Sequence, residues 1–181
     1  MKKYRYLIFF VLLVSMLAVG CTGTKDNNNG SQISSPQASE AAYQDTAWRE
    51  SIHKYTGLLG TDFENVRIAM NNTNNSDYAT LATLGQNITD HSQAALTENN
   101  QYTVSPQFRD AQKEWELALE DSNSAGKSVI MVANDIKNGN TSSKIEDIQK
   151  YIKYRSSMNV HLDKTATLLK NAYGTAGQTT S

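Results

Sequence analysis

Apolar residues recur at steps of three and four through most of the chain, a spacing typical of amphipathic helices. The pattern predicts helices over about 39–71, 77–99, 105–138 and 144–173, with no convincing strand between them. The first predicted helix carries one apolar stripe, formed by Trp48, Ile52, Tyr55, Leu59, Phe63, Val66 and Met70. The third carries a heptad-like seam, formed by Phe108, Ala111, Trp115, Ala118, Ser122, Ala125, Val129, Val132 and Ile136.

Helix-start and helix-stop signals separate these segments. The starts are Ser76 as an N-cap, Ser105 as an N-cap before Pro106, and Ser143 with Glu146 as a capping box; the stop is Asn138-Gly139. The joins at 71–76, 100–104 and 137–142 are short, and short joins favour antiparallel neighbours. The sequence therefore predicts an all-α, antiparallel up-down-up-down four-helix bundle over residues 40–173. A three-helix bundle with a detached first helix is the alternative, and the stripe from Trp48 to Met70 argues against it.

The last predicted helix contains a break in its pattern. Its stripe begins with Ile145, Ile148 and Ile152, but Arg155 and Asn159 stand where it would continue. Either the stripe shifts to Tyr151, Tyr154, Met158 and Leu162, or a polar layer lies in the core. The shift is favoured, because an unpaired buried arginine is very unfavourable. The residues expected to be mostly buried across the bundle are Leu59, Phe63, Ile88, Trp115, Val129, Ile148 and Leu169.

The N-terminus has a different character. Lys2, Lys3 and Arg5 precede an apolar run from Leu7 to Val19, and Gly20 and Cys21 close it. This order of basic, apolar and small residues is typical of a secretory signal. A membrane-spanning anchor is the alternative, but this run of thirteen residues, apolar except for Ser15, reaches only about 20 Å, less than the ~30 Å hydrocarbon core.

Leu17-Ala18-Val19-Gly20-Cys21 resembles the lipobox of prokaryotic membrane lipoproteins. The resemblance implies cleavage before Cys21, lipid on that cysteine, and anchoring of the protein to a membrane on its extracytoplasmic face. Residues 1–20 would be the signal peptide. Residues 21–39 are polar and rich in Asn, Ser and Gly, and we expect a flexible tether there. Residues 174–181 resemble a disordered tail.

Composition excludes several functions. Cleavage after residue 20 removes three of the 17 basic residues and none of the 18 acidic ones, which leaves a net charge of −4. Because no basic cluster remains, nucleic acid is not an expected partner. Cys21 is the only cysteine, so its lipidation would leave no thiol for disulfides, zinc binding or catalysis.

Candidate ligand-binding residues gather at one predicted height of the bundle. Antiparallel pairing of the first two helices brings His53 and His91 within about one turn of each other, with Gly57, Gly60 and Gly85 nearby. The glycines would let the backbones separate, and the histidines would orient a ligand. The outer tip, formed by 71–76 and 137–142, is the alternative location.

Glu50 and His53 also have the Glu-x-x-His spacing of di-iron bundles, but the chain contains no second such motif. His161 would lie more than 10 Å farther along the bundle. We therefore expect no cofactor and no enzymatic activity. The leading hypothesis is a binding or interaction module with a protein partner at the cell surface or a ligand to sense, and the alternative is a metal- or cofactor-binding bundle that uses His53, His91 and Glu50.

Overall fold

The computed structural model describes residues 43–71 and 77–176. The expected signal peptide, the lipidation site Cys21 and the tether over 21–39 lie outside these residues. The described part contains four α-helices, α2 (Asp45–Asn71), α3 (Tyr78–Asn99), α4 (Arg109–Asn138) and α5 (Thr141–Ala176), and one short 3-10 helix, η2 (Pro106–Phe108).

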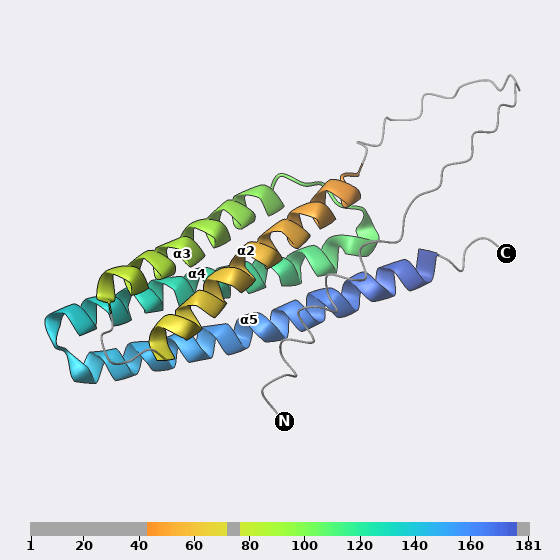
Figure 1. The fold of residues 1–181 in the computed structure, drawn as a ribbon. Coiled ribbons are helices and arrows are strands. Elements are labelled where there is room, and N and C mark those ends of the chain that lie inside the picture. The colour runs from red at the N-terminus through yellow and green to blue at the C-terminus, as the bar shows by residue number, and fades with distance from the viewer. Residues whose placement is uncertain (1–42, 72–76, 177–181) are drawn as a thin grey trace, which may run out of the picture. The chain divides into compact units, whose positions relative to one another are not determined.

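The four helices form the predicted antiparallel bundle (Figure 1). α4 packs closely along both α3 and α5, α2 packs along α3, and α2 approaches α4 at only a few positions. Helices that are consecutive in the chain are thus neighbours in space, as short connections require. The prediction of an all-α, up-down-up-down four-helix bundle is confirmed.

The core lies along the predicted apolar stripes. Trp48, Ile88, Trp115 and Val129 are almost completely buried. Of the seven residues expected in the core, Leu59, Phe63, Ile88, Trp115 and Val129 are buried, whereas Ile148 and Leu169 are partly buried against the core. Burial of these apolar side chains is the largest favourable contribution to the stability of the bundle.

The bundle end that contains the start of α2 is held by polar contacts. Trp48 Nε1 donates to Asn99 Oδ1 at 2.8 Å, a buried hydrogen bond between α2 and α3. The backbone N–H of Ser105 donates to Asp45 Oδ1 at 2.8 Å, and that of Gln44 donates to the carbonyl of Thr103 at 2.9 Å. These contacts use residues 44 and 45 to bind the 100–105 connection. α2 therefore begins at Asp45, and the predicted helical start at 39 is wrong at least for residues 43 and 44.

The helix starts differ in detail from the predicted caps. Asp77, not Ser76, caps α3, because its Oδ1 accepts from the backbone N–H of Ala79 at 3.0 Å. α5 begins at Thr141, two residues before the expected capping box, and Ser143 Oγ donates to Asp135 Oδ1 on α4 instead. The predicted stop at Gly139 is confirmed, since its φ of 72° is left-handed.

The stripe of α5 shifts, as the sequence favoured. Tyr151, Met158, Thr165 and Ala172 form the buried face, at steps of seven residues. Ile145 and Ile152, expected in the core, are instead 53% and 58% exposed. α5 also continues to Ala176, beyond the predicted boundary at 173, so the tail expected from 174 is helical at its start.

Candidate functional site

The three glycines expected at one height do not share a cavity in the structure. Gly57 is exposed and a Cβ there would meet nothing within 4 Å, Gly60 is half-buried, and Gly85 is buried. Gly85 faces α4: a Cβ on it would lie 2.9 Å from the carbonyl oxygen of Gly126. The close approach that the glycines indicated therefore exists, but between α3 and α4. Sequence reasoning paired Gly85 with α2 because it compared only the first two helices.

The two histidines of the expected site have different surroundings. His91 lies beside Asp62, with 2.6 Å between Nδ1 and Oδ2. His53 precedes Asp62 by nine residues, or about 13 Å along the helix, and both His53 and Glu50 are exposed. No hydrogen bond or ion pair joins His53 to His91 within the described residues. In residues 43–71 and 77–176, no three His, Cys, Asp or Glu side chains gather as metal ligands would.

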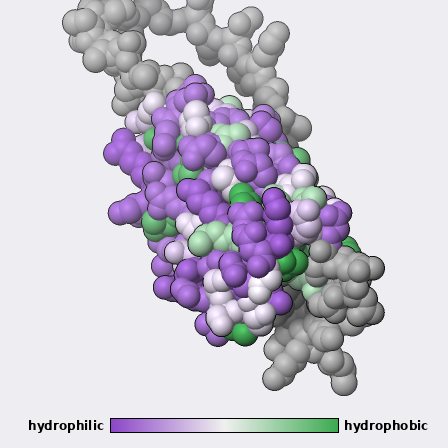
Figure 2. Space-filling view, turned by 90° about the vertical axis from the view of Figure 1, so that its left-hand side faces the viewer, coloured by the Kyte–Doolittle hydropathy of each residue, from purple (hydrophilic) through white to green (hydrophobic). Residues whose placement is uncertain are grey.

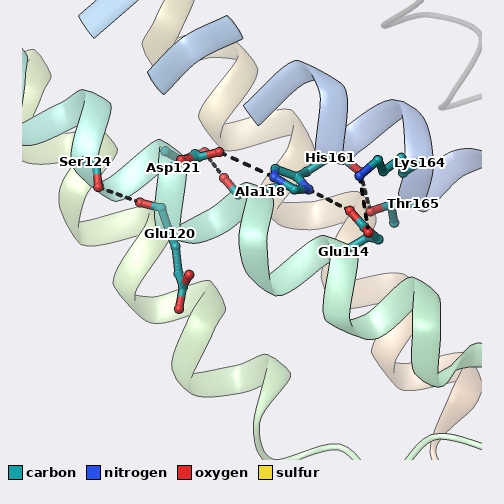
Figure 3. A network of polar contacts seen from close by, with 9 residues as sticks. Glu114, Ala118, Glu120, Asp121, Ser124, His161, Lys164 and Thr165 are labelled. Atoms are coloured by element: carbon teal, nitrogen blue, oxygen red, sulfur yellow. Dashed lines mark hydrogen bonds and ion pairs between the residues drawn. The ribbon is translucent and has the colours of Figure 1, made fainter. Parts of the chain in front are cut away.

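A polar network joins α4 and α5 (Figure 3). His161 Nδ1 is 2.6 Å from Glu114 Oε2, and His161 Nε2 is 3.9 Å from Asp121 Oδ2. Lys164 Nζ adds a contact of 3.6 Å to Glu114 Oε1. One imidazole from α5 is therefore flanked by two carboxylates from α4.

The electrostatics of this network define the role of each group. The hydrogen bond from His161, with the nearby charge of Lys164, holds the pKa of Glu114 below its usual value. An ionised carboxylate can only accept, so Nδ1 of His161 carries the hydrogen that it donates to Glu114. The arrangement orients one helix against the other.

This network was missed by sequence reasoning, although a signal for it exists. Glu114 and Asp121 are seven residues apart and therefore lie on one face of α4. His161 was compared only with the other histidines, not with the carboxylates of the helix that precedes it.

An open hollow of about 650 Å³ lies on the outer side of α3 and on the turn that follows it. Apart from Ala94, its lining residues carry polar groups, and they comprise Asp90, Gln93, Thr97, Glu98, Gln101 and Tyr102. Within it, Tyr102 donates from its hydroxyl to Glu98 Oε1 at 2.8 Å, and Lys54 Nζ lies 3.2 Å from Glu98 Oε2. The hydrogen bond from Tyr102 is the largest of the contacts that lower the pKa of Glu98 to about 2. Both carboxylate oxygens of Glu98 are therefore already bound by side chains of the protein itself.

The outward-facing apolar residues gather more clearly on α5 than elsewhere. Ile145, Ile152 and Val160 are 53%, 58% and 52% exposed, and the next most exposed large apolar residue, Met131, is 46% exposed. By contrast, the bundle end that contains the α4–α5 turn, which faces the viewer in Figure 2, is mostly hydrophilic with separate hydrophobic spots. The described part of the outer tip, residues 137–142, therefore offers no continuous apolar surface on the face in view, and residues 72–76 of the tip lie outside the described residues.

Comparison with known proteins finds no matching family, no similar curated protein and no similar solved structure. Among the described residues, none of the helices combines the length and the apolar character that a membrane crossing needs.

Proposed function

We propose that this chain is a lipid-anchored, extracytoplasmic helical bundle that acts as a non-enzymatic binding or interaction module. The observation that carries the proposal is the N-terminal order of basic residues, apolar run, Gly20 and Cys21 ahead of a separate bundle. Two acyl chains on a processed Cys21 would give the stable membrane attachment that one chain does not. The polar stretch over 21–39 would let the bundle stand clear of the lipid surface.

The polar groups of the bundle support an interaction role over catalysis. His91 and His161, which are two of the three histidines in the chain, each contact a carboxylate on a neighbouring helix. These contacts orient helices rather than activate a nucleophile. The exposed isoleucines of α5 supply the kind of surface that an interacting protein uses. Protein binding therefore fits the chemistry of the exposed surface better than a reaction does.

Anchoring is tested with Cys21→Ser in cells that process lipoproteins, with Thr22→Ser as the matched control. We expect the parent and Thr22→Ser proteins to incorporate a labelled fatty acid and to remain in the membrane fraction. Cys21→Ser should incorporate no label and should be unprocessed or released. Unchanged processing and membrane retention of Cys21→Ser would contradict the anchoring proposal.

The interaction role is tested against the metal alternative by elemental analysis of the purified full-length protein. We expect metal far below one ion per chain and no visible chromophore. Stoichiometric metal that is lost in His53→Ala or His91→Ala, but retained in His161→Ala, would favour the metal-binding alternative.

A further inference from the structure

The outer face of α5 carries a regular stripe of seven exposed residues. They are Ile145, Gln149, Ile152, Ser156, Val160, Asp163 and Thr167, and every one is exposed. At 3.6 residues per turn they fall within an arc of about 80° and extend over about 33 Å of helix. Three of them are the most exposed large apolar side chains in the described part. Single exposed apolar residues are ordinary, whereas an aligned set on one helix indicates a contact surface.

The stripe is symmetric about Ser156. Its members precede and follow Ser156 by four, seven and eleven residues. The paired positions are compatible when they face each other: Ile152 and Val160 are both apolar, the Gln149 amide can donate to the Asp163 carboxylate, and Ile145 can pack on the methyl group of Thr167. A second copy turned by 180° would place each of these pairs face to face.

We propose that α5 is a self-association surface through which two copies of this chain pair antiparallel, with Ser156 on the two-fold axis. Ile152 of each copy packs against Val160 of the other, and Gln149 donates a hydrogen bond to Asp163. The small side chain of Ser156 lets the helices approach closely at the axis. Such an interface is isologous, since the same patch serves both copies. The proposal names the partner of the interaction module and in that sense rests on the proposed function.

The polar members of the stripe set the direction of pairing. Neither the side chain of Gln149 nor the carboxylate of Asp163 takes part in a hydrogen bond or ion pair within the described residues. A parallel pair in register would place Asp163 against Asp163, which is unfavourable for like charges. The antiparallel pair places each carboxylate against an amide donor. Attachment to a membrane would raise the local concentration of copies, so a single-helix interface of modest affinity is sufficient.

The first test is disulfide trapping in the full-length protein on the membranes of producing cells. Ser156→Cys should form a covalent dimer under mild oxidation, because the two-fold axis places both residues 156 together. Thr83→Cys, on the exposed side of α3, is the matched control, and the parent chain measures any contribution from Cys21. No dimer in Ser156→Cys, or equal dimer in Thr83→Cys, would overturn the proposal.

The second test asks for the direction of pairing in the Ser156→Cys background. Gln149→Glu places two like-charge pairs across each dimer and should reduce trapping roughly fivefold. Gln149→Lys places the ammonium opposite Asp163 and should maintain or increase trapping. Equal losses in both variants would mean that residue 149 faces its own copy, as in a parallel pair, and would overturn the antiparallel arrangement.

Two controls separate the possible failures. Thermal unfolding by circular dichroism should be unchanged in all these variants, since the substituted side chains are exposed. Membrane retention is measured in the same samples. Retention without trapping overturns self-association alone, whereas release of the parent chain from the membrane overturns the anchoring proposal alone.

Discussion

α4 and α5 both carry apolar residues at helical spacing, yet they use them differently. The predicted seam that runs from Phe108 in η2 to Val132 in α4 is buried throughout. The predicted stripe of α5 is divided: its shifted residues Tyr151 and Met158 are buried, while Ile145 and Ile152 are exposed. α4 packs closely against α3 on one side and α5 on the other, whereas α5 packs closely only against α4. A helix with two close neighbours buries its apolar residues, but a helix at the edge can present a second apolar face.

The two helices are also joined differently to the rest of the bundle. α4 meets α3 through small residues, with Gly85 and Gly126 so close that a Cβ on Gly126 would lie 2.8 Å from the carbonyl oxygen of Gly85. α5 meets α2 through long side chains, including Tyr151 and Phe63, whose ring centroids are 6.3 Å apart. A single Cβ added at the α3–α4 contact therefore meets neighbouring atoms. The exposed side chains on the outer side of α5 can be replaced without disturbing a contact between helices.

The largest expected effect comes from the seam of α4. Trp115 is 1% exposed, so Trp115→Ala should lower the free energy of unfolding by about 3–5 kcal/mol through lost burial and a residual cavity. Urea denaturation followed by circular dichroism measures this. A loss below about 0.5 kcal/mol, the range of surface substitutions, would contradict the central position of α4.

The next effect concerns the glycine contact between α3 and α4. A Cβ at residue 126 would lie 2.6 Å from Thr89 Oγ1 and 2.9 Å from the backbone nitrogen of Thr89. Gly126→Ala should therefore destabilise the bundle by about 1–3 kcal/mol through overpacking. Gly57→Ala is the matched control, since open space surrounds residue 57, and it should stabilise by up to about 1 kcal/mol. Equal stabilisation by both substitutions would show that the helices are less tightly packed at Gly126.

A smaller effect is expected from the polar network that joins α5 to α4. Its contacts, above all the hydrogen bond from His161, lower the folded-state pKa of Glu114 below the unfolded value of 4.5. The network therefore stabilises the fold fully above pH 4.5, and this contribution is lost as the pH falls through the lower folded-state pKa.

Glu114→Gln should lower the free energy of unfolding at pH 7 by at most about 1 kcal/mol, since solvent screens the pair. The variant should also lose less stability than the parent below pH 4.5, and denaturant midpoints at pH 7, 5 and 3 measure both changes. If the parent and Glu114→Gln lost the same stability between pH 7 and pH 3, Glu114 would not be the source of the pH dependence.

The smallest effect is expected on the outer face of α5. Ile152→Ala should change the free energy of unfolding by less than about 0.5 kcal/mol, because the side chain is 58% exposed. Ile148→Ala, at a partly buried position on the same helix, serves as the comparison and should cost more. Strong destabilisation by Ile152→Ala at low protein concentration would mean that this face is buried within one chain.

Much of the fold was predictable because local signals agree with the tertiary arrangement. The seam of α4, the left-handed Gly139 and the short connection before Ser105 each indicate the same antiparallel neighbours. The prediction was least accurate where two neighbouring residues were equally suitable for the same position. Ser76 and Asp77 are both good N-caps, and the hydrogen bond from Ala79 to Asp77 decides between them.

The candidate site was harder to predict, because it depends on register between helices. His91 pairs with Asp62 of α2, a contact that spacing along α3 does not reveal. Likewise, Gly85 is a helix-interior glycine in any arrangement, but only the packing of α3 on α4 identifies Gly126 as its neighbour. Spacing along one helix determines which residues share a face, yet it does not determine which residue of the next helix stands opposite.

The sequence by itself determined that this chain forms helices, where they turn and which residues of α4 lie inside, because hydrophobic periodicity and capping are local properties. The sequence also favoured Tyr151 and Met158 on the inward face of α5, but only the tertiary structure decided that Ile145 and Ile152 lie on the outward face. Both faces satisfy the helical period, and the choice depends on the shape of the surface that α4 and α2 present. Tyr151, Met158 and Ala172 occupy that surface, and Ile145, Ile152 and Val160 therefore remain on the outside, where a second copy can meet them.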